Sequence, residues 1–412
     1  MAPIRTALIG LSSSAITAWA SQAHLPYLLS EHGKSRFKIT ALLNSSADAA
    51  KAAIAHYNLG SDVKAYGSPE DLAADKDIDF VACATRVDVH YDTIKPSVAA
   101  GKAVFVEWPL AENVKRASEL ADLAKQTGST TIVGIQARVS PVVTKVKEVL
   151  ESGAIGKVVS SNLQLTSPYV ERSRVSAGLA YFLDKKVGGN PVTIGLAHTL
   201  DFIHYVLGEY EDFDAHTQIQ HPNKVVYDKD SGEERQVTSD VPDLVSLHGT
   251  LKPSSFVMKG ASFTATYQVA PPWPGTLPLI WTITGEKGEL RITASKTAFL
   301  NVAGSGILIE QLDFASNEIK SIDWEFNAHI AELPERARNI STLYDLFAEG
   351  RLEEAGAADF AAAVNDRSPA LRTSQSTPRS RLTQQRASPS RRLDFGRHGF
   401  ALHSKLLLSI VN

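Results

Sequence analysis

The stretch Ala103-Val104-Phe105-Val106-Glu107-Trp108-Pro109 decides how the first part of the chain is interpreted. Residues 103–106 form a short apolar run rich in β-branched and aromatic side chains, which is typical of a strand buried on both faces of a parallel sheet. Proline cannot donate a backbone hydrogen bond, so the strand is expected to end before Pro109. Ligands of open α/β sheets bind beyond the carboxyl ends of the strands. Glu107 and Trp108 are therefore predicted to face a ligand; the alternative is that Pro109 only turns the chain and Trp108 only packs.

Strand-like and helix-like segments alternate over the first 135 residues around this stretch. Apolar runs that predict strands lie at 4–9, 37–43, 63–66, 78–84, 103–106 and 131–135. Patterns that predict helices lie at 47–57, from 68, at 91–100 and at 114–126. Such alternation predicts an α/β domain with a doubly wound parallel sheet of the Rossmann type. We assign residues 1–138 to this NAD(P)-binding domain.

The turn after the first predicted strand has small residues where dinucleotide-binding proteins have glycines. In the usual G-x-G-x-x-G pattern, the glycines allow a tight turn, close approach of the pyrophosphate and packing of the helix on the strand. Gly10, Ser12 and Ala15 hold these three places, and apolar residues recur at helical spacing from Ile16 onward. The Cβ of Ser12 narrows the phosphate approach without closing it. The pattern favours NAD or NADP as cofactor, with a plain turn between strand and helix as the alternative.

The end of the second predicted strand bears on the choice between these cofactors. An acidic residue at this place would hydrogen-bond the ribose hydroxyls of NAD. The chain has Asn44, Ser45 and Ser46 there, which neither repel a 2′-phosphate nor supply an arginine to bind one. The choice between NAD and NADP therefore stays open. Asn44 and Ser45 are candidate cofactor-binding residues, although Ser45 or Ser46 could instead cap the helix at 47–57.

After residue 139 the pattern changes to a series of strands. They lie at 158–166, 212–220, 244–251, 262–269, 279–284, 289–293 and 307–312, with helices at 142–151, 193–207 and 330–348. Strands clustered after an α/β half predict an α+β domain with a large, mostly antiparallel sheet. We assign residues 139–350 to this domain, which would bind the substrate or a partner and form a dimer. The helix at 330–348, which Pro334 is expected to disturb, should pack back on the first domain.

The 412 residues carry a formal net charge of −3, but the charge is unevenly distributed. Residues 367–412 contain eight Arg and one Lys against one Asp, so the rest of the chain is acidic and a poor binder of nucleic acid. Residues 366–412 are rich in Ser, Pro and Arg, which predicts either a disordered tail or an artefact of the gene model. The second explanation is favoured because a helical pattern is cut off at residues 360–364.

Other bulk features fit an ordinary protein of a reducing compartment, although they do not require that compartment. The single cysteine, Cys83, lies in an apolar run and cannot form a disulfide within the chain. The N-terminus has no signal-peptide layout, and no apolar stretch approaches the ~18 residues of a membrane span. We therefore expect the cytoplasm, with the nucleus as the alternative, and no membrane association. No metal site is predicted.

Several motifs together resemble the glucose–fructose oxidoreductase/inositol dehydrogenase/MocA family. They are the Gly10 turn, residues 85–90, residues 101–109, residues 152–157 and residues 285–290. Within the family, residues 136–141 and 198–201 are similar to the branch that contains the fungal repressor of the galactose regulon. The resemblance runs from residue 4 to residue 346, and it implies that Thr85, His90, Glu107 and Trp108 line the cofactor.

The chain departs from this family at two positions that handle protons. Dehydrogenases of the family carry Glu-Lys-Pro where this chain has Glu107-Trp108-Pro109, and the resemblance implies that the lysine helps to move the substrate proton. An indole has no titratable group, so Trp108 cannot replace this lysine. Ile194 stands where the family has an aspartate four residues before His198. His198 remains as the candidate catalytic residue, because imidazole titrates near neutral pH; the alternative is a hydrogen-bonded structural histidine.

Two functions fit these features. The first is an NAD(P)-dependent oxidoreductase that acts on a sugar, polyol or related hydroxyl or carbonyl compound, with His198 handling the proton. The second is a catalytically silent, NAD(P)-binding regulator that holds a protein partner, as the galactose repressor holds its activator, and Trp108 favours it. We favour the first function, and we expect a homodimer. A DNA-binding role for the basic tail is disfavoured.

Overall fold

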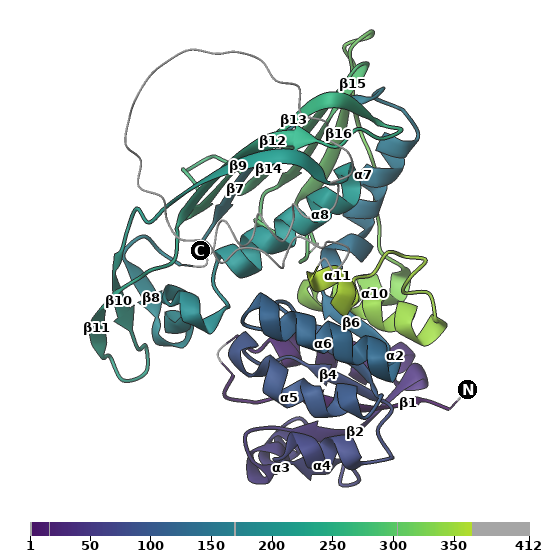
Figure 1. Cartoon of the computed structure of the whole chain (residues 1–412), viewed down its shortest axis with the longest axis vertical. Coiled ribbons are helices and arrows are strands. Elements are labelled where there is room, and N and C mark those ends of the chain that lie inside the picture. The colour runs from purple at the N-terminus through teal and green to yellow at the C-terminus, as the bar shows by residue number, and fades with distance from the viewer. Residues whose placement is uncertain (1, 16, 169, 303, 365–412) are drawn as a thin grey trace, which may run out of the picture.

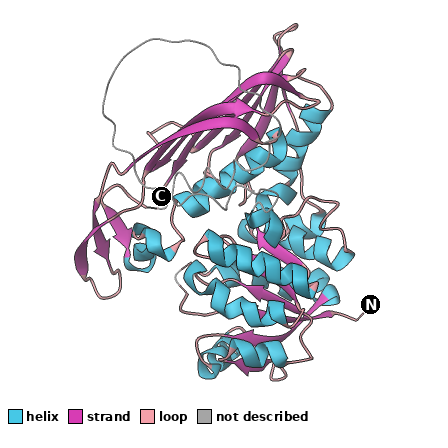
Figure 2. Ribbon diagram, viewed as in Figure 1, coloured by secondary structure: helices cyan, strands magenta, loops and turns pink. Residues whose placement is uncertain are grey.

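The structure, a computed structural model, describes residues 2–15, 17–168, 170–302 and 304–364. Two sheets dominate it, one in the N-terminal part (purple to blue in Figure 1) and a larger one in the C-terminal part (teal to green). Figure 2 shows helices beside both sheets. The tail predicted at 366–412 lies outside the described residues. Within the described ranges, no helix is long and apolar enough to cross a membrane.

The N-terminal part contains a six-stranded sheet in which every neighbouring pair is parallel. The strands are β1 (Ile4–Ile9), β2 (Phe37–Leu43), β3 (Lys64–Tyr66), β4 (Phe80–Cys83), β5 (Ala103–Glu107) and β6 (Thr131–Gly134). Their order, β3-β2-β1-β4-β5-β6, is that of a doubly wound fold. Each face of the sheet has its own apolar core, which explains the uninterrupted apolar runs. The predicted Rossmann fold is confirmed.

Helices connect these strands, as the alternating pattern predicts. They include α3 (Ala47–His56), α4 (Pro69–Ala74), α5 (Val87–Ala99) and α6 (Val114–Thr127). The Ser46 side chain accepts a hydrogen bond from the backbone N–H of Ala49, so Ser46 is the N-cap of α3. The capping alternative for this serine is therefore confirmed.

The first helical segment begins later than the sequence pattern predicts. Apolar spacing from Ile16 indicated a helix directly after the first turn, but Ala18 has a φ of +48°, which a right-handed helix cannot include. The chain instead forms the short π-helix η1 (Ala20–His24), followed by α1 (Leu25–Leu29) and α2 (Glu31–Arg36). Ala15 consequently lies in a loop, and not at the contact between helix and strand that the G-x-G-x-x-G pattern would give it.

The C-terminal part contains an eight-stranded sheet ordered β17-β16-β15-β14-β7-β13-β12-β9. Its strands are β7 (Val158–Ser167), β9 (Tyr210–Gln218), β12 (Leu244–Leu251), β13 (Val257–Val269), β14 (Leu279–Gly285), β15 (Gly288–Ala294), β16 (Ile307–Asp313) and β17 (Ile319–Ser321). All neighbouring pairs are antiparallel except β7 with β13. Helices α7 (Pro141–Glu151) and α8 (Ala197–Leu207) lie along one face and share a core with the sheet (Figure 1). The predicted large, mostly antiparallel sheet is confirmed.

A second, three-stranded sheet in this part is not predicted by the sequence pattern. It consists of β8 (Arg174–Ser176), β10 (Asn223–Tyr227) and β11 (Glu234–Thr238), in the order β11-β10-β8. β8 is short and the side chains of β11 are mostly exposed, so neither strand shows the apolar alternation by which strands are recognised.

The C-terminal helices pack back on the N-terminal part, as predicted. The pattern indicated a helix at 330–348 with a disturbance near Pro334, and the chain forms α9 (Ala328–Ala331) and α10 (Glu335–Glu349) on either side of this proline. Tyr344 of α10 is fully buried, and its ring centroid lies 5.2 Å from that of Phe37 and 5.9 Å from that of Phe80. Helix α10 is therefore part of the core beneath the first sheet.

The last described helix, α11 (Phe360–Val364), lies beside β6. The backbone N–H of Val133 donates to the carbonyl oxygen of Ala358 at 2.8 Å, and that of Phe360 donates to Oγ1 of Thr131 at 3.1 Å. The Phe360 side chain is buried in the core on this face of the parallel sheet.

We expect Phe360→Ala to lower the free energy of unfolding by about 3–5 kcal/mol, because it leaves a cavity in that core. Urea denaturation followed by circular dichroism measures the loss. Phe314→Ala is the matched control, since Phe314 is 47% exposed, and it should change the free energy by no more than about 0.5 kcal/mol. Equal effects of the two variants would contradict the packing of α11 described above.

Candidate functional site

Glu107, the last residue of β5, is turned into the protein interior. Its side chain is 10% exposed, and Oε1 lies 2.9 Å from Nε2 of His24. The other ring nitrogen, Nδ1, lies 2.9 Å from the hydroxyl of Tyr344. Burial raises the pKa of Tyr344 well above its usual value, so the phenol stays protonated and donates to Nδ1, while Nε2–H donates to the carboxylate. His24 therefore holds the Glu107 carboxylate, and the contact of Glu107 with the cofactor stays a prediction.

Trp108 joins the end of β5 to the second part of the chain. Its indole N–H donates to the backbone carbonyl of Thr193 at 2.7 Å. Thr193 lies in η5 (Val192–Leu196), a short π-helix that leads directly into α8. The Trp108 ring also meets the His198 ring near its edge, with centroids 6.5 Å apart. The Trp108 indole therefore forms a hydrogen bond and a ring contact at the junction between the N-terminal and the C-terminal domain.

The loop before η5 places the Thr193 carbonyl. Oδ1 of Asn190 accepts hydrogen bonds from the backbone N–H groups of Val192 and Thr193, each at 3.0 Å, and so caps the π-helix. Gly188 has a φ of +82°, and a Cβ there would lie 2.5 Å from Cα of Glu112. Only glycine fits this close approach, which holds the loop against the segment that follows Pro109.

His198 lies in the first turn of α8 and is almost completely buried. Its Nδ1 has no hydrogen-bond partner within the described part of the chain. Burial lowers the pKa of His198 to about 4, even though the charges of Glu107 and Asp201 raise it. The ring is therefore neutral near pH 7.

An ion pair between two sequence motifs fixes the position of α8. Arg138, in the 3₁₀-helix η2 (Gln136–Val139), donates from Nη2 and Nε to the two carboxylate oxygens of Asp201 at 2.6 and 2.9 Å. The motifs at 136–141 and 198–201 thus meet in space through a bidentate contact. Next to Arg138, the amide of Gln136 is fully buried, and neither its nitrogen nor its oxygen has a partner among the residues described.

The predicted nucleotide turn lies at the carboxyl ends of β1, β2 and β4. Gly10 has a φ of +89°, and a Cβ there would lie 2.7 Å from Cγ2 of Thr85, so only glycine is accommodated. The Asn44 side chain donates to the carbonyl of Leu11 at 2.9 Å, which braces the turn. Ser12 follows and is partly exposed. The structure therefore brings Gly10, Ser12, Asn44 and Thr85 together, with Ser45 exposed beside them.

His90 braces two loops at the same edge of the sheet. Its Nδ1 lies 2.9 Å from the carbonyl oxygen of Pro109, and its Nε2 lies 3.0 Å from that of Thr85. Burial lowers the pKa of His90, so the ring is neutral and donates to one carbonyl at a time. His90 thus holds the loop after β4 against the loop after β5.

Two family models match the chain in succession. The model of the oxidoreductase family with an NAD-binding Rossmann fold, GFO_IDH_MocA, matches residues 4–135, and that of the C-terminal domain of Gal80p matches residues 141–294. Dehydrogenase aclE of Aspergillus oryzae is 32% identical over 289 residues, which are 70% of this chain and 76% of that protein. The chain belongs to the GFO_IDH_MocA oxidoreductase family. The predicted membership is confirmed.

Relatives of this GFO_IDH_MocA protein include a regulator as well as dehydrogenases. The galactose/lactose metabolism regulatory protein GAL80 of Saccharomyces cerevisiae is 29% identical over 303 residues, 71% of this chain and 67% of that protein. A super-repressor mutant of Gal80p from this yeast has a similar structure, with a TM-score of 0.75 at 23% identity over 88% of this chain and 93% of that one. Levoglucosan dehydrogenase, in complex with NADH and levoglucosan, has a TM-score of 0.66 at 17% identity over 88% and 94%. At these identities the structural similarity shows the fold alone.

Several residues that shape the site of this GFO_IDH_MocA protein are not predicted by the sequence pattern. His24 contacts Glu107, which is 83 positions away in the sequence, and Tyr344, which is 320 positions away. No local pattern signals such pairs. The ion pair of Arg138 with Asp201 had a partial signal, because both residues lie in motifs that resemble the galactose-repressor branch of the family.

We expect Asp201→Asn to lower the free energy of unfolding by about 3–5 kcal/mol, because it leaves the largely buried Arg138 guanidinium without a carboxylate. The double variant Arg138→Met/Asp201→Leu should lose less, since it leaves no charge unpaired. Chemical denaturation of the three proteins measures both losses. A double variant that is less stable than Asp201→Asn would be evidence against this account of the ion pair.

Proposed function

We propose that this protein transfers hydride between a nicotinamide dinucleotide and a hydroxyl group of a sugar, polyol or related compound, with His198 as the group that takes up the proton. The observation that carries the proposal is the buried, neutral imidazole of His198, whose Nδ1 has no partner among the described residues and whose ring lies against Trp108. Membership in a family of NAD-binding oxidoreductases supplies the chemical class.

The turn after β1 fits the cofactor. Gly10 allows the chain to pass close to Thr85, and this leaves the edge of the sheet beyond β1 free of a Cβ. Ser12, Asn44 and Thr85 surround this edge with neutral polar groups that hydrogen-bond a phosphate or ribose. When bound, the nicotinamide takes up or releases hydride. The neutral end of β2 supports NAD and NADP equally, so the proposal includes both.

Oxidation of an alcohol releases a proton as well as a hydride. The C–H bond breaks with its electron pair going to the nicotinamide, the O–H proton passes to a base, and a carbonyl forms. Trp108 cannot accept this proton. His198 can, because burial keeps its imidazole unprotonated near pH 7, although the lowered pKa makes it a weaker base than an exposed imidazole. We therefore assign proton uptake to Nδ1 of His198.

A catalytically silent regulator is the second candidate function. The Trp108 indole, at the place where the sequence resemblance puts the family's lysine, is bound to the Thr193 carbonyl and bridges the two domains. GAL80, a regulatory protein, is among the relatives. In this case the protein would bind the cofactor and a protein partner without turning over a substrate.

The remaining parts of the proposal concern organisation. The first sheet ends at Gly134 and α7 begins at Pro141, which supports a domain boundary near residue 138. We propose further that the protein forms a homodimer through the domain that begins there. Its substrate would be sugar-like, and its location would be the cytoplasm or the nucleus.

Ser12→Glu should weaken binding of NADH or NADPH by about tenfold or more, because it places a carboxylate against the pyrophosphate. Fluorescence titration of the reduced cofactor measures the affinity. Ser61→Glu makes the same change of charge just before β3, at the amino ends of the strands, whereas Ser12 lies at their carboxyl ends. This control should leave the affinity for the cofactor unchanged. If Ser12→Glu and Ser61→Glu bind the cofactor as tightly as the parent protein, the assigned cofactor site is wrong.

His198→Ala should lower turnover by about 10²- to 10⁴-fold and leave cofactor affinity intact, because a general base is lost. Trp108→Lys should lower the stability, because it removes the hydrogen bond to the Thr193 carbonyl, but should retain turnover, since it restores the family's proton-handling group. Nicotinamide absorbance followed over a panel of sugars and polyols measures both, with His216→Ala, an exposed histidine of β9, as the control.

Full activity in His198→Ala would refute the role of this histidine. Absence of activity in the parent protein and in both variants, with cofactor binding retained, would favour the regulator.

A further inference from the structure

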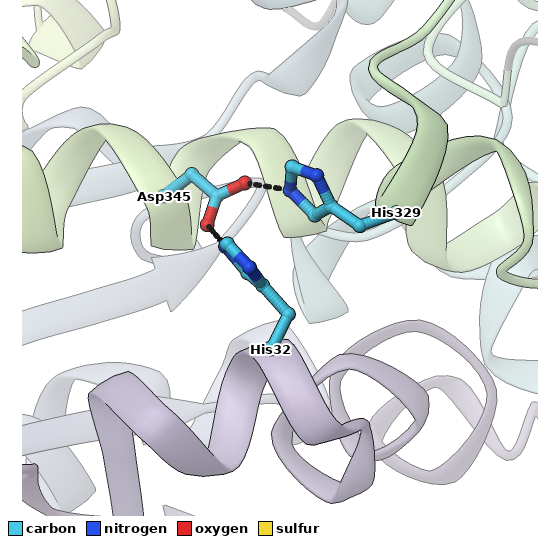
Figure 3. Close-up of side chains that lie close together, drawn as sticks. All are labelled: His32, His329 and Asp345. Carbon is cyan, nitrogen blue, oxygen red and sulfur yellow. Dashed lines mark hydrogen bonds and ion pairs between the residues drawn. The ribbon is translucent and has the colours of Figure 1, made fainter.

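Three side chains that can bind a metal converge outside the site described above (Figure 3). His32 belongs to α2 of the first domain, His329 to α9 and Asp345 to α10. Nε2 of His32 lies 3.0 Å from Oδ1 of Asp345, and Nε2 of His329 lies 2.7 Å from Oδ2. One ligand atom from each residue lies within 4.8 Å of the other two.

The two imidazole rings are stacked, with centroids 3.9 Å apart and an angle of 27° between their planes. Both rings therefore direct the same nitrogen toward one carboxylate, as Figure 3 shows. The histidine side chains are 30% and 33% exposed, whereas the Asp345 side chain is 9% exposed. The carboxylate is thus anchored in the protein, while the side of the histidines is open to an ion and to water.

We propose that His32, His329 and Asp345 form a binding site for a divalent transition-metal ion, with zinc as the best match. Two imidazole nitrogens and one carboxylate oxygen are a common zinc donor set, and a fourth position would be taken by water. Calcium and magnesium prefer oxygen ligands throughout, so two nitrogen donors disfavour them. Metal–ligand bonds of about 2.0 Å in a tetrahedron would separate the ligand atoms by about 3.3 Å, so the Asp345 carboxylate would have to move back from the two rings by a few tenths of an ångström.

The residues around Asp345 support this role. The hydroxyl of Tyr27 donates to Oδ1 of Asp345 at 2.6 Å, and Tyr27 is itself fully buried and stacked on Tyr344 at 5.3 Å. Such a hydrogen bond orients a ligating carboxylate and tunes its affinity for a metal. Tyr27 therefore acts as a positioning residue for the proposed ligand.

One neighbouring charge opposes a cation, and it limits where the ion can lie. Nη1 of Arg36 is 3.6 Å from Oδ1 of Asp345, but it also pairs with Oε1 of Glu349 at 2.9 Å, which offsets its charge. The ion is therefore expected near Oδ2, the oxygen that faces His329.

Binding would link the two parts of the chain. The ion would join α2 to α9 and α10, and α10 also carries Tyr344, which contacts the His24 ring beside Glu107. A metal that binds only the folded protein raises its stability. The proposed site would thus fasten the C-terminal helices to the first domain.

Isothermal titration of the full-length, chelator-treated protein with zinc chloride tests the proposal. We expect one ion per chain and a rise in melting temperature with zinc. His32→Ala and His329→Ala should each weaken zinc binding by about 100-fold or more, since loss of a ligand exceeds the 10- to 100-fold effect of losing an outer hydrogen bond. Tyr27→Phe should weaken it by about tenfold. His56→Ala, which removes an exposed histidine of α3, should have no effect.

A second measurement separates loss of the site from loss of the fold. Cobalt(II) replaces zinc in tetrahedral sites and gives visible absorption bands, which the two histidine variants should lack while their metal-free melting temperatures stay near that of the parent protein. The proposal is overturned if the parent protein binds no zinc. It is also overturned if His32→Ala and His329→Ala bind zinc as tightly as His56→Ala.

Discussion

The rest of the structure depends on how the Glu107 carboxylate is buried. A carboxylate removed from water costs several kcal/mol unless hydrogen bonds and charges compensate it. His24 supplies the hydrogen bond and Tyr344 orients the histidine, although these residues come from the first helical segment and from α10. Gly134 on the neighbouring strand leaves the necessary space, since a Cβ there would lie 2.5 Å from Oε2 of Glu107. Helix α10 therefore has to pack against the first sheet to complete the hydrogen bonds that compensate the buried carboxylate at the end of β5.

A second constraint acts at the junction of the domains. The Trp108 indole reaches the backbone just before α8, and the ion pair of Arg138 with Asp201 holds the first turns of the same helix. Because one contact is a directional hydrogen bond and the other is bidentate, together they fix both the position and the rotation of α8. His198 owes its place beside Trp108 to these two contacts.

The replacement of lysine by tryptophan therefore changes more than one functional group. A lysine at this place would carry a mobile charge, whereas the indole of Trp108 forms a fixed bridge between two domains. Of the proton-handling positions that the sequence resemblance assigns, His198 remains, and burial keeps its imidazole neutral. The relatives of this chain include both a dehydrogenase and a regulatory protein.

The sequence by itself determined the two sheets, most helix positions, the cap at Ser46 and the requirement for glycine at position 10, because apolar period, capping and turn chemistry depend on neighbouring residues. It also placed His198 correctly on a buried helix. Only the tertiary structure decided that His24 binds the Glu107 carboxylate and that His32 and His329 meet on one carboxylate. These contacts join residues up to 320 positions apart, and no local periodicity encodes which buried polar groups must satisfy one another.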